Sequence, residues 1–219
     1  MLKYILFISA IANWVVVPAQ TVHARDEPRH HNVFENEFIR ILDAHLGPKD
    51  TTLYHLHNTP SVFIIFTNTN VGSQLMGGQA QKGANVTGAV DYDSLKIPRI
   101  HRVWNEDTSW FHVMDVELTS TKQKINIPVL QNPFLKLLFN EQQVNGYIID
   151  LKASNTLGLP ASANGYLVVS QTEALIEYKI NGITQHRFLK PGHYIWVEAG
   201  KSFSLKGRNA ANFVLLQLK

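Results

Sequence analysis

Apolar residues in this chain fall into many short runs of strand length, separated by polar turns and glycines. In the first half, the runs expected to form strands lie at 38–45, 51–57, 61–67, 71–76, 89–97, 100–104 and 110–118. After residue 140 the pattern returns, at 146–153, 165–170, 174–180, 184–189, 193–198 and 212–218. No long stretch has the 3.6-residue period of an amphipathic helix, so the pattern predicts an all-β protein.

The two halves are separated by a polar segment that prolines interrupt. Pro128 and Pro133 fall within it, and the short apolar run 134–139 has the length of one or two helical turns. We therefore expect a short helical connection over 121–139. In the second half, Asn181-Gly182 between two apolar runs predicts a two-residue hairpin turn.

An internal repeat relates the two halves of the chain. The segment 52–66 can be laid without a gap on 156–170, and each reads as a strand, a turn and an apolar strand. In this pairing His55 falls on Leu159 and His57 falls on Ala161. We therefore expect two related β-domains, over 33–120 and 140–219.

The N-terminus has the pattern of a signal peptide. Lys3 precedes a run of about 14 mostly apolar residues, which is shorter than the roughly 20 that a membrane-spanning helix needs. Small-residue cleavage sites end at Ala19 and Ala24. We expect residues 1–24 to be removed and the protein to be exported, to the periplasm or the medium; an uncleaved anchor is the alternative. Residues 25–32 are expected to be a flexible lead-in with solvated histidines.

Composition limits the partners and the chemistry. The net charge of +3 comes from 20 basic and 17 acidic residues, and the basic residues are scattered, so we expect no nucleic-acid partner. No later segment has the length to span a membrane. The chain has no cysteine, which excludes thiolate ligands and a cysteine nucleophile. Any transition metal must therefore be held by nitrogen and oxygen atoms.

Three histidines form the candidate site. His55 and His57 alternate with apolar residues on one predicted strand, so both point to the same face and could bind one metal ion. His101 lies on a later predicted strand and offers a third imidazole. A single histidine on a strand is usually a structural residue. A metal site therefore requires that all three imidazoles lie close together.

These motifs resemble those of the cupin superfamily. His-x-His before a turn and an apolar strand, followed by His101-x-x-x-Asn105, is similar to its two characteristic motifs. The resemblance implies jelly-roll β-barrels, here two in tandem as in bicupins, with His55, His57 and His101 as metal ligands. Two positions depart from the family: Ser61 and Val62 stand where a glutamate is usual, and Pro98 replaces a glycine.

In the second half, the segment 199–203 resembles the second motif, with Phe203 in the place of histidine. The resemblance therefore implies a degenerate C-terminal barrel without metal.

The sequence is compatible with two functions. The first is a metal-dependent enzyme, dioxygenase- or isomerase-like, that acts on a small organic molecule with Fe, Zn, Cu, Ni or Mn. The second is a non-catalytic module that binds a small ligand with weak or no metal. Four residues are candidates to line the pocket or support the ligands: His45, Ser61, Asn105 and His112. Homodimer formation is left open.

Overall fold

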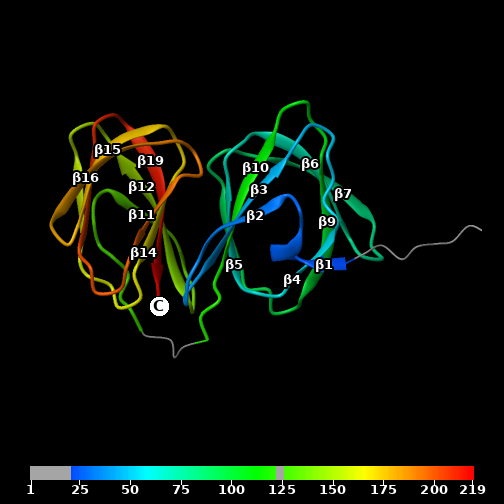
Figure 1. Cartoon of the computed structure of the whole chain (residues 1–219), viewed down its shortest axis with the longest axis horizontal. Coiled ribbons are helices and arrows are strands. Elements are labelled where there is room, and N and C mark those ends of the chain that lie inside the picture. The colour runs from blue at the N-terminus through cyan, green and yellow to red at the C-terminus, as the bar shows by residue number, and fades with distance from the viewer. Residues whose placement is uncertain (1–20, 122–125) are drawn as a thin grey trace, which may run out of the picture.

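The computed structural model describes residues 21–121 and 126–219, and these form two β-barrels that lie side by side (Figure 1). The predicted all-β fold is confirmed. The expected signal peptide lies outside the described residues up to residue 20. No helix in the described part of the chain has the length and apolar character needed to cross a membrane.

The N-terminal barrel consists of two five-stranded sheets. The first, which we call the inner-site sheet, has in order β1 (Thr21–His23), β4 (Tyr54–His57), β9 (Arg99–Asn105), β6 (Thr69–Leu75) and β7 (Ala80–Asn85). The second packs on the C-terminal barrel, and we call it the shared sheet. It has in order β2 (His30–Glu35), β3 (Arg40–Leu46), β10 (Phe111–Glu117), β5 (Ser61–Ile65) and β8 (Val90–Asp93).

The C-terminal barrel repeats this topology strand for strand, apart from β1. One sheet has the order β11 (Leu135–Asn140), β12 (Val144–Leu151), β19 (Ala211–Leu218), β14 (Tyr166–Ser170) and β17 (Tyr194–Val197). The other has the order β13 (Thr156–Leu159), β18 (Phe203–Gly207), β15 (Ala174–Ile180) and β16 (Ile183–Leu189). The internal repeat seen in the sequence is thus a repeat of topology.

The expected flexible lead-in at 25–32 is wrong. The chain forms β1, a short 3-10 helix η1 (Ala24–Asp26) and β2, and β1 pairs in parallel with β4. The buried Glu27 carboxylate fixes the segment, because it accepts hydrogen bonds from the backbone N–H groups of Arg29 at 2.6 Å and Leu53 at 3.1 Å. The segment lacks an apolar pattern because several of its contacts are polar.

The expected helical turns at 134–139 are also wrong. This run forms the edge strand β11, which pairs antiparallel with β12, and η1 is the one helix among the described residues. A short apolar run fits either structure, and here pairing with a neighbouring strand decides. Strand β7 was not expected because it is exposed and carries a glycine. The predicted hairpin turn is confirmed, since Asn181 and Gly182 have φ angles of 49° and 83°.

Two large apolar clusters hold the molecule together. One fills the C-terminal barrel; its bulkiest buried members are Tyr147, Tyr166 and Phe213. The other joins the barrels: the outer face of β3, β5 and β10 packs on the outer face of β12, β14 and β19. The N-terminal barrel interior has only a small apolar cluster, around Leu46, Ile65 and Phe111. This difference leaves room for a cavity in the N-terminal barrel.

Candidate metal centre

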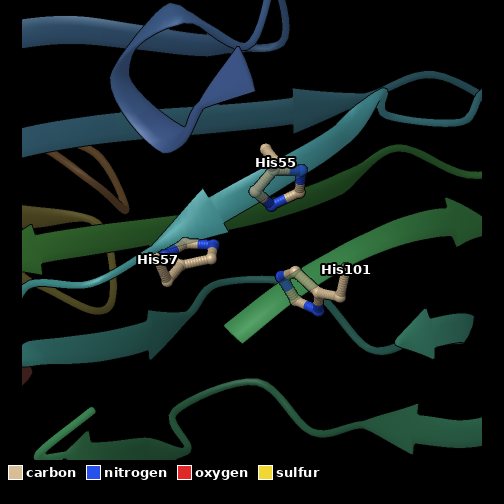
Figure 2. A group of neighbouring side chains, drawn as sticks. All are labelled: His55, His57 and His101. Atoms are coloured by element: carbon tan, nitrogen blue, oxygen red, sulfur yellow. The ribbon is translucent and has the colours of Figure 1, made fainter. Parts of the chain in front are cut away.

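The structure brings His55, His57 and His101 together inside the N-terminal barrel (Figure 2). Strands β4 and β9 are antiparallel neighbours, and His55 lies directly opposite His101. Alternation along β4 turns His57 to the same face as His55. The ring centroids are 4.6 Å apart for His55 and His101, 4.9 Å for His55 and His57, and 5.1 Å for His57 and His101.

The ring nitrogens of these histidines are poised to accept a ligand. Nδ1 of His55 lies 2.9 Å from the carbonyl oxygen of Leu53. A carbonyl can only accept, so Nδ1 donates and Nε2 keeps its lone pair. Nε2 of His101 is buried and has no hydrogen-bond partner. A buried polar atom left unpaired costs about 1–3 kcal/mol, so convergent unpaired nitrogens fit a site for a metal ion. One nitrogen from each ring lies within 4.8 Å of the others.

Burial keeps the rings of His55 and His101 neutral, which is the form that binds metal. It lowers the pKa of His55 to about 3, with further lowering from the nearby rings of His30 and His57. Burial likewise lowers the pKa of His101 to about 2, with added effects from His55 and His57. At neutral pH, protons therefore do not compete for the nitrogens of His55 and His101.

Two further polar residues reach this centre that the sequence did not reveal. His30, from β2, lines the cavity with its ring centroid 4.8 Å from that of His55. Its Nδ1 lies 2.7 Å from the carbonyl oxygen of Ala24, which leaves Nε2 free to accept. Burial lowers the pKa of His30 as well. The His30-His31 pair was the available signal, because neighbouring strand residues face opposite sides and one of them had to point inward.

Asp115 is the second of these residues and supplies a carboxylate. It lies on β10 and is buried, and neither of its oxygens has a hydrogen bond. Its Oδ2 is 3.3 Å from Nδ1 of His57. Nδ1 of His57 also has no hydrogen bond, so the two groups are close but not aligned. If Nδ1 donates to this carboxylate, Nε2 of His57 is left as the ligand atom. The signal in the sequence was an acid between two apolar residues, Met114 and Val116.

The centre opens into a cavity of about 260 Å³. Much of its wall is apolar and includes Phe63, Ile65, Val103, Phe111 and Val113. Arg99 also lines it: one guanidinium nitrogen, Nη1, donates to Asp93 at 2.9 Å, while Nε is buried without a partner. The cavity thus combines an apolar wall, an unpaired cationic donor, the imidazoles and the carboxylates of Asp91 and Asp115.

Ser61 and Asn105, two of the predicted pocket or supporting residues, do not line the cavity. The Ser61 hydroxyl donates to the carbonyl oxygen of Thr59 at 3.0 Å. The Asn105 amide donates to the carbonyls of Leu46, Gly47 and Ser109, at 3.2, 3.1 and 2.7 Å. Asn105 therefore ties the ends of β3 and β9 to the loop before β10, and it supports the barrel that carries the centre.

His45 and His112, the other two candidates, lie on the opposite face of the shared sheet. Ala44 and Val113 line the cavity, so their strand neighbours His45 and His112 face outward. The structure therefore does not bring these two histidines to the centre. In the C-terminal barrel, β13 and β18 carry no histidine, and Phe203 pairs opposite Leu159 with both side chains buried.

Comparison with known proteins gives neighbours in structure alone. No family model and no curated sequence matches this chain. Salicylate 1,2-dioxygenase from Pseudaminobacter salicylatoxidans has a TM-score of 0.62 and 11% identity, over 85% of this chain and 72% of that one. YhaK from Escherichia coli has a TM-score of 0.54 and 12% identity, over 86% and 90% of the two chains.

A cupin 2 conserved barrel domain protein from Leptotrichia buccalis has a TM-score of 0.53 and 12% identity, over 85% of this chain and 86% of that one. Together with the strand-for-strand repeat of the two barrels, these neighbours confirm the fold that the histidine motifs predicted. The chain has a two-barrel, bicupin-like fold.

Proposed function

We propose that this protein is a metal-dependent enzyme that acts on a small organic anion, with a dioxygenase- or isomerase-like reaction in the N-terminal barrel. The observation that carries the proposal is the convergence of three imidazoles, two buried and one half-buried, whose ligand atoms lie within 4.8 Å of one another. A structural neighbour that is a dioxygenase supports it. The C-terminal barrel, filled with apolar side chains, serves as a packing partner in this proposal.

Each residue of the centre has a role in this proposal. His55, His57 and His101 hold a divalent transition metal, and Asp115 orients the His57 ring. When bound, such an ion supplies Lewis-acid polarisation or a redox centre for dioxygen. His30 stands beside the three rings as a fourth imidazole that can hold or move a proton at Nε2.

The cavity supports a compact anionic substrate with an apolar body. Its volume of about 260 Å³ falls just below the roughly 300–1,000 Å³ of pockets for drug-sized ligands. The unpaired Nε of Arg99 is a charged donor for a carboxylate, and Phe63 and Phe111 offer flat apolar walls. Salicylate 1,2-dioxygenase, a structural neighbour, has a structure in adducts with gentisate, which supports a ligand of this kind.

The test is reconstitution of the purified protein with Fe²⁺ without oxygen, followed by oxygen-uptake assays on a panel of hydroxylated aromatic and aliphatic acids. We expect turnover and one metal ion at the three histidines in the native protein, and loss of turnover and of that ion in His57→Gln. His186→Gln changes an exposed histidine of the C-terminal barrel and is the matched control. A protein that takes up no metal at the three histidines refutes the proposal.

A non-catalytic ligand-binding module is the second candidate. The observation that favours it is the absence of the motif glutamate, since Ser61 and Val62 occupy that region. This function predicts that anions from the same panel raise the melting temperature of the metal-free protein, and that Arg99→Gln removes this shift. Turnover in the presence of metal would favour the enzyme over the non-catalytic module.

We also propose that the protein is exported and that the leader is cut after Ala19. A cut after Ala24 would remove β1, which pairs with β4 beside His55, and would remove the carbonyl that His30 contacts. The pairing of β1 with β4 supports the earlier site. N-terminal sequencing of the exported protein should read Gln20 first; a start at Arg25, or an uncut chain, contradicts this.

A further inference from the structure

A second group of metal-ligating side chains lies on the outer face of the shared sheet. Asp43 and His45 are two residues apart on β3, and His112 on β10 lies directly opposite His45. On the other side of β3, His31 of β2 lies opposite Asp43. Alternation turns all four side chains away from the cavity, so three neighbouring strands present them on one face.

The three residues nearest one another already share contacts through nitrogen and oxygen. Nε2 of His112 lies 2.7 Å from Oδ1 of Asp43, and Nε2 of His45 lies 3.0 Å from Oδ2. The His45 and His112 rings stack, with centroids 4.0 Å apart. The ligand atoms of Asp43, His45 and His112 all lie within 4.8 Å of one another. His31 is close by, with its ring centroid 6.4 Å from that of His45.

We propose that Asp43, His45 and His112 form a second divalent-metal site, with His31 as a further ligand on the exposed side. Two imidazoles and a carboxylate suit Zn²⁺, Cu²⁺, Ni²⁺ or Co²⁺. The site is separate from the inner centre, because the shared sheet lies between them and no ligand is common to both. The proposal of this second site therefore does not depend on the proposed enzymatic function.

The two oxygens of the Asp43 carboxylate each face one ring, Oδ1 that of His112 and Oδ2 that of His45. A metal ion that binds both Nε2 atoms would need rings that carry their proton on Nδ1, because a protonated nitrogen has no lone pair to give.

The position of the site connects it to the contact between the barrels. Met114 and Val116 continue the same outer face of β10 and pack on the C-terminal barrel. Gly192, in the turn before β17, approaches His112 so closely that a Cβ atom there would lie 2.8 Å from its Cε1. The site therefore lies at the edge of the contact, where an ion would fix the end of the shared sheet next to this turn.

The experiment is a titration of the metal-free, full-length mature protein with Zn²⁺ by calorimetry and with Co²⁺ by visible absorption. We expect two equivalents for the native protein and one for His45→Gln/His112→Gln. We expect one equivalent, at the outer site, for His55→Gln/His57→Gln. His186→Gln, which changes an exposed histidine elsewhere, should keep two. Circular dichroism of each metal-free variant checks that it folds.

The outcomes separate the two sites. If His45→Gln/His112→Gln binds as many equivalents as the native protein, the second site is wrong and the cluster is a hydrogen-bonded network only. If that variant loses all binding while the native protein holds one ion, the outer site stands and the inner centre fails. Should the double variant not fold, Asp43→Asn replaces it. This substitution keeps the shape and removes the charge, and it should weaken the outer equivalent alone; an unchanged titration overturns the proposal.

Discussion

Acidification of the metal-free protein should destabilise it steeply, because the barrel buries neutral histidines. The perturbation is a change from pH 7 to pH 5. Histidine has an ordinary pKa of 6.5, whereas in the folded protein the pKa of His55 is about 3 and that of His101 is about 2. Below pH 6.5 the unfolded chain therefore binds protons at these residues that the folded chain does not bind.

The sign and the size follow from proton linkage. A histidine whose pKa falls on folding contributes stability that is present above pH 6.5 and is lost as the pH falls toward its folded pKa. Between pH 7 and pH 5 each such group lowers the free energy of unfolding by about 2 kcal/mol, so His55 and His101 together lower it by about 4 kcal/mol. This is a large part of the roughly 5–15 kcal/mol of a typical domain.

Two other groups modify the expected curve. The pKa of His30 is also lowered by burial, so His30 adds a loss in the same direction. Burial, reinforced by the nearby Asp115, raises the pKa of Glu117 from 4.5. Glu117 therefore favours the folded state as the pH falls toward 4.5 and acts against the histidines at the acid end of the range.

The assay is urea unfolding of EDTA-treated protein at pH 7, 6 and 5, followed by tryptophan fluorescence. His101→Leu removes one of the two groups and should reduce the loss between pH 7 and pH 5 by about 2 kcal/mol. His186→Leu, at an exposed site, should leave the loss unchanged. A free energy of unfolding that does not fall between pH 7 and pH 5, or a His101→Leu variant with the full loss, would refute the reasoning.

Three further predictions concern single residues. Asp115→Asn removes the carboxylate beside His57 and should weaken metal binding by roughly 10–100-fold, measured by calorimetry. An unchanged affinity would mean that Asp115 has no role in metal binding. Gly72→Ala places a Cβ atom that overlaps the Trp104 indole, so urea unfolding should show a loss of about 1–3 kcal/mol; native stability would mean that the ring moves freely. Asn105→Ala removes the hydrogen bonds that its amide donates to three backbone carbonyls and should cost about 1–3 kcal/mol of stability at unchanged metal stoichiometry, measured by urea unfolding and metal analysis. Loss of metal without loss of stability would place Asn105 in the site instead.

The inner histidines could be predicted because the sequence carries their geometry. His55 and His57 share a face by strand alternation alone, and the resemblance to cupin motifs supplied the pairing that places His101 opposite His55. The same alternation shows why β5 is apolar on both faces from Val62 to Ile65. Phe63 and Ile65 face the cavity, while Val62 and Ile64 pack on the other barrel.

Other parts of the site depend on which strands become neighbours, and local pattern does not encode this. His30 reaches the centre only because β2 pairs with β3, and Asp115 does so only because β10 lies between β3 and β5. The position of His45 and His112 in the chain suggested that they lie near the pocket. Side chains alternate between the two faces of a strand, however, and these two fall on the outward face. The face of a strand can be assigned only once one of its residues is known to be inside.

The most direct test of the metal centre is the anomalous scattering of crystals of the mature protein soaked in Zn²⁺. The account predicts a peak within roughly 2.0–2.1 Å of one nitrogen from each of His55, His57 and His101. Crystals that bind zinc elsewhere, with no peak between these three rings, would contradict it.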